Sequence, residues 1–172
     1  TSFLTALNKN LKEATALLGG SGAKGTWLSG NYDVDIFVQY DYKKYSPKSS
    51  TLSEYLEPIL QKTFPKIKLE RLHGSRDYFR LTYENINFEV VPILKLKKAE
   101  NAINITDVSP LHAKWVNTYT KKTKDDILLS KQFCKANGMY GAESYIGGFS
   151  GYVLEILIAQ YGSFEKLLKA SL

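Results

Sequence analysis

Residues 18–40 read LGGSGAKGTWLSGNYDVDIFVQY, a glycine-rich segment followed by an alternating pattern that carries two aspartates. Positions 32–40 are rich in β-branched and aromatic residues and predict a β-strand. Side chains of a strand alternate between its two faces, so Asp33 and Asp35 share one face and Val34 points into the core. Two carboxylates this close repel each other unless a cation, a proton or strong donors compensate them. The pair favours a magnesium site, although an Asp-x-Asp pattern also occurs by chance on surface strands.

A third carboxylate on a neighbouring strand would strengthen this interpretation. Glu89 is the candidate, because it lies in the apolar run Asn87–Pro92, where an unpaired charge is costly. The alternative for Glu89 is a solvated strand carboxylate. The glycine-rich segment is not a Walker phosphate loop, since Lys24 precedes Gly25 and the required Gly-Lys-Ser/Thr order is absent.

The remaining sequence predicts helices around strands and then helices alone. Leucine spacing indicates one helix over residues 2–18, and Thr51 with Glu54 indicates a capping box that opens a helix which Pro58 kinks or shortens. Further predicted elements are strands over 66–71, 78–83 and 87–94 with a turn at 84–85, a helix N-capped by Ser109, a helix opened by Thr123 and Asp126 and ended by Gly138, and helices over 150–161 and 163–170.

These elements predict an α+β fold in which a mixed sheet flanked by helices is followed by an all-helical segment. The change in pattern places a domain boundary near residues 100–108, giving one domain over 1–107 and a helical one over 108–172. The chain has 172 residues, of which 44% are hydrophobic, enough for one domain and part of a second.

Composition narrows the class of protein. The single cysteine, Cys134, excludes a disulfide framework and suits the cytoplasm, and no segment approaches the roughly 20 apolar residues of a membrane span. Twenty-three Lys plus Arg against 17 Asp plus Glu give a net charge of +6. That excess fits either a solvated lysine-rich surface or a partner made of phosphates.

Several ordered motifs resemble those of one family. Gly20-Ser21 followed by Asp33-Val34-Asp35 resembles the signature of the DNA polymerase beta nucleotidyltransferase superfamily. The surrounding sequence is similar to archaeal-type (class I) CCA-adding tRNA nucleotidyltransferases, over essentially the whole chain. The similar segments are KGTWLSG at 24–30, VVP at 90–92, SPLH at 109–112, GMYGAE at 138–143, GGFSGY at 147–152 and EILI at 155–158.

The resemblance implies a polymerase-beta-like head and part of a helical neck. It implies that Asp33, Asp35 and Glu89 hold two magnesium ions, with Glu89 replacing the aspartate usual in the family. It also implies a set of nucleotide-binding residues: Ser21, Lys24, His112, Lys131 and Tyr140.

Taken singly, these residues have plainer explanations. Lys24 is then a surface lysine, Lys131 lies on a solvated helix face, and Tyr140 packs after the Gly138 cap. His112 is then an ordinary partly buried helix histidine.

The implied activity is template-independent transfer of CMP and AMP from CTP and ATP to the 3′ end of tRNA. Two alternatives stay open: the same core acting on another RNA, a protein or a small molecule, and a non-catalytic nucleotide- or RNA-binding module. Lysines at 43–44, 95–98 and 121–124 could follow an RNA backbone. Family members continue beyond the neck, so we expect a fragment, a minimal enzyme, or a second chain that supplies the tRNA-binding domains.

Overall fold

The computed structural model describes residues 2–30 and 33–172, and the chain divides into two compact units. The first unit comprises residues 1–23 and 32–112, and the second comprises residues 24–31 and 113–172. The second unit is therefore built from two separate segments of the chain. Tyr32, with which the predicted strand begins, lies outside the described residues.

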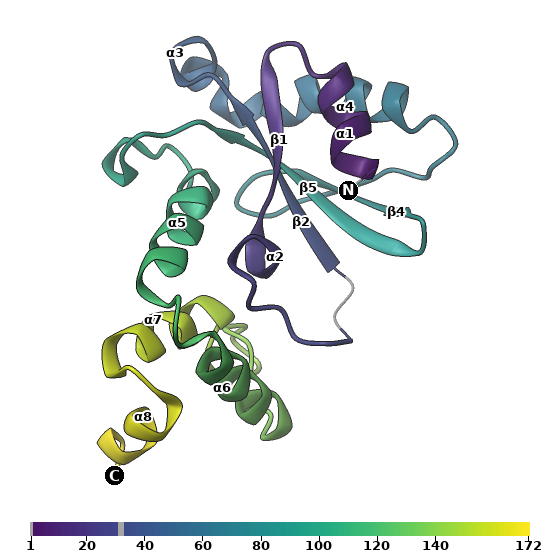
Figure 1. Cartoon of the computed structure of the whole chain (residues 1–172). Helices are drawn as coiled ribbons and strands as arrows, with labels where there is room; N and C mark the ends of the chain where they lie inside the picture. Colours follow the sequence, from purple (N-terminus) through teal and green to yellow (C-terminus); the bar gives the residue numbers. More distant parts are fainter. Residues whose placement is uncertain (1, 31–32) are drawn as a thin grey trace. The chain divides into compact units, whose positions relative to one another are not determined.

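A mixed five-stranded sheet organises the first unit (Figure 1). β2 and β5 run parallel at its centre, and every other neighbouring pair is antiparallel. This confirms the predicted α+β class with a mixed sheet. In the order in which they lie side by side, the strands are β1 (Ala14–Leu18), β2 (Asp33–Tyr40), β5 (Ile86–Leu94), β4 (Tyr78–Tyr83) and β3 (Glu70–Leu72).

One face of this sheet carries the hydrophobic core. Helices α1 (Ser2–Asn10) and α4 (Leu52–Thr63) pack on it, and Phe3 of α1 stacks on Phe88 with ring centroids 4.1 Å apart. The strands contribute alternate residues such as Ile36, Val38 and Val90 to the same core. The intervening residues of β2 and β5, including Asp33, Asp35 and Glu89, therefore lie on the opposite face.

The prediction of one helix over residues 2–18 is wrong. The helix ends at Asn10, and residues 14–18 form β1, in which Leu17 pairs with Phe37 of β2. The leucine spacing is compatible with a helix or a strand, and hydrogen bonding to β2 makes residues 14–18 a strand. The turn at Glu84-Asn85 is confirmed, since both residues adopt positive φ, as a two-residue hairpin requires.

Two other predicted details are wrong. The Thr51 hydroxyl donates to the carbonyl of Lys48 instead of capping α4. Pro58 lies inside α4, which runs on to Thr63. The strand predicted over residues 66–71 is shorter, because β3 covers only Glu70–Leu72. Short helices complete the first unit: α2 (Gly20–Lys24, whose last residue belongs to the second unit), α3 (Tyr42–Tyr45) and the 3₁₀ helices η1 (Ser46–Thr51), η2 (Ala99–Asn101) and η3 (Ile105–Val108).

A buried ion pair fixes the end of β5. Arg76 donates to Asp107 Oδ1 at 2.6 Å and to the carbonyl of Pro92 at 3.0 Å. The same carboxylate accepts from the backbone of Leu94 at 2.9 Å and from that of Asn104 at 3.0 Å. The last contact forms part of a capping box on η3, which runs directly into α5. Ser109 consequently has a helical backbone and is not the predicted N-cap.

Helices form the rest of the chain: α5 (Ser109–Tyr119), α6 (Lys124–Ala136), α7 (Gly151–Tyr161) and α8 (Phe164–Ala170). Ile127 of α6, Ile158 of α7 and Phe164 of α8 form the small core of the second unit. The Ser150 and Ser163 side chains accept from the backbone N–H groups of Val153 and Lys166 and so cap α7 and α8. Gly138 follows the end of α6 with a φ of +68°. Among the described residues, no helix is long and apolar enough to span a membrane.

Candidate functional site

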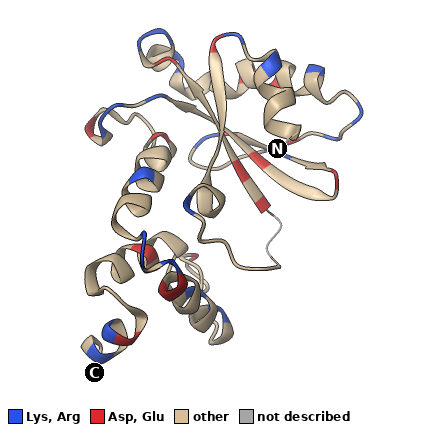
Figure 2. Ribbon diagram, in the orientation of Figure 1, with Lys and Arg blue, Asp and Glu red and all other residues tan. Residues whose placement is uncertain are grey.

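The candidate carboxylates lie on adjacent strands of the first unit. In the parallel pair of β2 and β5, Asp35 is opposite Glu89 and Asp33 is opposite Asn87. Asp33 is exposed, and Asp35 and Glu89 are half-buried. Figure 2 shows acidic residues as bands across these neighbouring strands. The strand register thus brings the three predicted carboxylates to one sheet face, as the period-two pattern indicates.

Two glycines allow the chain to pass directly over Asp35. The backbone N–H of Gly19 donates to the carbonyl of Asp35 at 2.7 Å. Gly20 has a φ of +51°, and a Cβ atom there would overlap the Oδ2 atom of Asp35. Only glycine combines this left-handed conformation with so close an approach. The glycine-rich segment therefore frames the Asp35 carboxylate.

Glu89 is already paired with a cation from the protein itself. Arg80, opposite Glu89 on β4, donates from Nη2 and Nε to Glu89 Oε1 at 2.7 Å and 3.2 Å. Hydrogen bonding to Glu89 is the main cause that raises the pKa of Arg80, and the charge of Asp33 adds to it. Across residues 2–30 and 33–172, no three carboxylate, histidine or cysteine side chains are gathered closely enough to hold a metal ion.

The donor chemistry of the first unit nevertheless fits a hard divalent cation. Asp33, Asp35 and Glu89 offer oxygen ligands on adjacent strands, the ligand type that magnesium prefers. The ion pair with Arg80 keeps Glu89 apart from this set. Asp33 and Asp35 are thus the primary candidate ligands, and Glu89 joins them only if it exchanges Arg80 for the metal.

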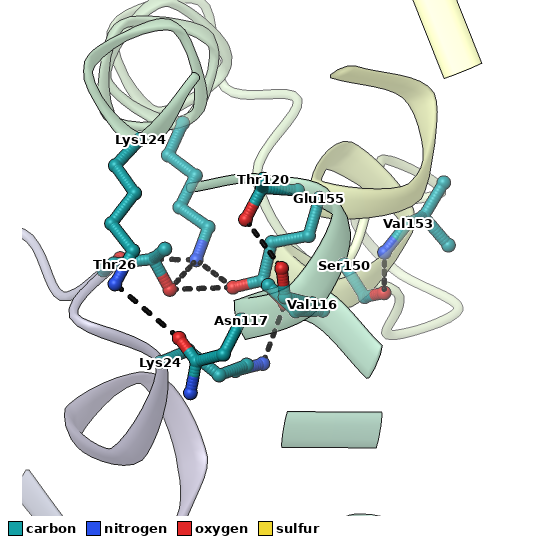
Figure 3. Close-up of polar contacts among 10 residues, drawn as sticks. Lys24, Thr26, Val116, Asn117, Thr120, Lys124, Ser150, Val153 and Glu155 are labelled. Atoms are coloured by element: carbon teal, nitrogen blue, oxygen red, sulfur yellow. Dashed lines mark hydrogen bonds and ion pairs between the residues drawn. The ribbon is translucent and has the colours of Figure 1, made fainter. Parts of the chain in front are cut away.

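The second unit contains a buried carboxylate surrounded by donors (Figure 3). Glu155 of α7 is fully buried; its Oε2 accepts from Lys24 at 2.6 Å, and its Oε1 accepts from Lys131 at 2.7 Å and from the Thr26 hydroxyl at 2.6 Å. Lys131 also donates to the Thr26 carbonyl and hydroxyl, at 3.0 Å and 3.2 Å. We call Lys24, Thr26, Lys131 and Glu155 the Glu155 cluster.

Burial and charge act in opposite directions in this cluster. Burial alone raises the pKa of Glu155, but the charges and hydrogen bonds of Lys131 and Lys24 outweigh it and leave that pKa below its ordinary value. Burial lowers the pKa of Lys131, and the charge of Glu155 opposes this effect. Two lysine side chains thus donate to this one buried carboxylate.

The two lysines differ in what they can still offer to a ligand. The side chain of Lys131 is 2% exposed, and its hydrogen bonds to Glu155 and to the carbonyl and hydroxyl oxygens of Thr26 account for all three of its N–H donors. It is therefore not on a solvated helix face. The side chain of Lys24 is 12% exposed and also lies 5.6 Å from the centre of the Tyr152 ring. Lys24 is the better placed of the two to meet a phosphate.

The other predicted nucleotide-binding residues are divided between the units. Ser21, on α2, and His112, on α5, are half-buried residues of the first unit. Tyr140 belongs to the second unit, where it forms an isolated bridge with Phe149. A Cβ at Gly151 would lie 2.8 Å from the Tyr140 hydroxyl and 3.3 Å from Lys131 Nζ. Tyr140 thus borders the Glu155 cluster, and burial raises its pKa.

Three candidate functional residues were not predicted from the sequence: Glu155, Thr26 and Arg80. Glu155 carried a signal, because it is a single acid within the apolar run 152–158 of α7. Arg80 carried a weaker one, because it lies at an alternating position of a strand whose neighbour contains Glu89. Thr26 carried none, since its partner is 129 residues away in the chain.

Comparison with known proteins agrees with this fold. Residues 1–133 match the nucleotidyltransferase domain family, and residues 125–172 match the second domain of tRNA nucleotidyltransferases. Among solved structures, a cyclic dinucleotide synthase of Elizabethkingia meningoseptica has a TM-score of 0.66 at 19% identity, over 98% of this chain and 72% of its own. The polymerase core of TRAMP, an RNA surveillance complex, has a TM-score of 0.61 at 18% identity, over 93% and 47%. These likenesses show the fold alone.

Curated relatives are more similar in sequence. The CCA-adding enzyme of Nanoarchaeum equitans is 47% identical over 156 residues, which make up 90% of this chain and 38% of that protein. The CCA-adding enzyme of Sulfolobus acidocaldarius is 40% identical over 162 residues, again 38% of that protein. The chain spans well under half the length of these relatives. It belongs to the nucleotidyltransferase domain family, and its sequence is similar to the corresponding part of these CCA-adding enzymes.

Proposed function

We propose that the chain is the catalytic part of an enzyme that transfers CMP and AMP from CTP and ATP to the 3′ end of tRNA. The observation that carries the proposal is the row of carboxylates, Asp33 and Asp35 on β2 beside Glu89 on β5, under the glycines that cover Asp35. The similarity to CCA-adding enzymes over most of the chain supports tRNA as the acceptor.

In this proposal Asp33, Asp35 and Glu89 hold magnesium. Bound there, magnesium would lower the pKa of an attacking hydroxyl and neutralise charge on a leaving pyrophosphate. Asp33 and Asp35 supply the negative charge that attracts the ion, and Gly20 keeps the space beside Asp35 free of a side chain.

The triphosphate is the second element of the proposal. The Ser21 hydroxyl can donate to a phosphate oxygen, and Lys24 can add a point charge. In this proposal Lys131 contributes its positive charge, because Glu155 and Thr26 hold its ammonium group in place. Tyr140 borders the same cluster and can donate from its hydroxyl. His112, on α5, would contribute an imidazole N–H donor.

A transfer assay tests the proposal directly. The chain is incubated with magnesium, labelled CTP or ATP, and tRNA that ends before CCA. We expect label in the tRNA, and a loss of about 100-fold or more in Asp35→Asn, because a metal ligand supplies several kcal/mol to the transition state.

The matched control is Glu165→Gln, which removes an exposed carboxylate on α8 and should leave the rate unchanged. Transfer only to other acceptors would contradict tRNA as the substrate. Nucleotide binding without any transfer would contradict catalysis.

A further inference from the structure

Arg80 is the one arginine that faces the candidate metal ligands among the described residues. Through the strand register, Arg80 of β4 is opposite Glu89 of β5, and Glu89 is opposite Asp35 of β2. The three side chains therefore form one row across the sheet face away from the core. By contrast, Arg71 pairs with Asp77 and Glu57, and Arg76 pairs with Asp107.

The contact between Arg80 and Glu89 occupies a ligand atom. Both guanidinium donors go to the same oxygen, Glu89 Oε1, at 2.7 Å and 3.2 Å. An oxygen that accepts two charge-assisted hydrogen bonds is a poorer ligand for a cation, because its lone pairs are already engaged. Arg80 also places a positive charge beside the site that a divalent cation would enter.

The pair is exposed enough to open. The side chain of Arg80 is 46% exposed and that of Glu89 is 25% exposed. Ion pairs at such a surface contribute little to stability, because solvent screens the charges and two long side chains must be ordered. A bound divalent cation can therefore displace Arg80 at small cost, whereas it could not displace the buried partner of Asp107.

We propose that Arg80 is a positioning residue that holds Glu89 in the absence of metal and competes with the divalent cation for it. Glu89 then has two states: paired with Arg80, or turned toward the metal held by Asp33 and Asp35. This inference rests on the proposed function, because it assumes that the carboxylate row binds metal. It assigns to Arg80 a role in metal affinity that a purely structural cross-strand ion pair would not have.

The test measures metal binding by the full chain without nucleotide. Mn²⁺ serves as the probe, and free Mn²⁺ is followed by electron paramagnetic resonance. The variants are Arg80→Gln, which removes the competing cation, and Arg80→Lys, which keeps the charge but loses the paired donors. Arg71→Gln is the matched control, since it removes the same charge from a strand arginine paired elsewhere.

We expect Arg80→Gln to bind Mn²⁺ about two- to fivefold more tightly than the wild type, the range set by an ion pair at a half-exposed surface. Arg80→Lys should fall between the two, and Arg71→Gln should match the wild type. Circular dichroism confirms that each variant is folded. If Arg80→Gln misfolds, the Mn²⁺ affinities of Arg80→Lys and Arg71→Gln are compared instead, and tighter binding by Arg80→Lys is then the expected result.

Two different failures can be told apart. Unchanged or weaker Mn²⁺ binding in Arg80→Gln, with wild-type binding that Asp35→Asn abolishes, would overturn the role of Arg80 and leave the metal site standing. Wild-type Mn²⁺ binding that is absent, or insensitive to Asp35→Asn, would overturn the proposed function itself, and the inference with it.

Discussion

Glu155→Gln should destabilise the second unit strongly. The glutamine keeps the size of the side chain but removes the charge that Lys131 and Lys24 share, and it offers one acceptor oxygen where the carboxylate offered two. Breaking a buried ion pair by removing one partner costs about 3–5 kcal/mol, because the other charge stays buried and uncompensated.

The exposure of the two lysine side chains narrows the expected loss of unfolding free energy. The Lys24 side chain, at 12% exposure, can turn toward water, whereas that of Lys131, at 2%, cannot. The cost therefore comes chiefly from one ammonium group, and we expect about 3 kcal/mol. For a chain of this length, that corresponds to a fall of about 6–12 °C in Tm.

Chemical and thermal unfolding measure this effect. Glu165→Gln is the control, because its ion pair with Lys169 is exposed and should change stability by less than about 0.5 kcal/mol. The double variant Lys131→Met/Glu155→Gln should be more stable than Glu155→Gln alone, since it no longer buries an unpaired charge. A loss below about 1 kcal/mol in Glu155→Gln, or simple additivity in the double variant, would refute the reasoning.

Three further results are expected. The pKa of Glu155 lies below its ordinary value of 4.5, so its contribution to stability is present above pH 4.5 and is lost as the pH falls through the lowered pKa. The free energy of unfolding should therefore fall more steeply with acidification in the wild type than in Glu155→Gln, and equal slopes would contradict this. Gly20→Ala should abolish Mn²⁺ binding, because the added Cβ would overlap Asp35. Gly138→Ala is the control: that position also has a positive φ but faces open space, so the variant should bind Mn²⁺ normally, and equal Mn²⁺ affinity in the two variants would contradict the role of Gly20. Arg76→Met should cost about 3–5 kcal/mol in urea unfolding, because it leaves a buried carboxylate unpaired, and a loss under about 1 kcal/mol would argue against that ion pair.

Local patterns predict much of this fold. Alternation predicts β2 and the β4–β5 hairpin, and the hairpin needs only its own sequence, since Glu84 and Asn85 adopt the positive φ that the turn requires. Residues 14–18 were wrongly predicted as helix because their structure depends on pairing with β2. That pairing is a long-range contact, which no local spacing encodes.

The candidate site shows the same division. Asp33 and Asp35 follow from the period of a single strand, and the register confirms that Glu89 lies beside Asp35. The partner of Glu89 lies only nine residues away across the β4–β5 hairpin, whereas the partners of Lys131 could not be predicted, because they come from distant segments. Glu155 contacts Lys24 across 131 residues of chain, and only the folded structure brings them together.

The composition of the second unit has a consequence for how such a gene can be divided. A coding piece that starts at residue 108 would supply Lys131 and Glu155 but neither Lys24 nor Thr26, which come from the segment before β2. The helices encoded by that piece would carry a buried carboxylate stripped of two of its three donors. Fusion, duplication or exchange of these helices should therefore preserve the Glu155 cluster only when residues 24–31 accompany them.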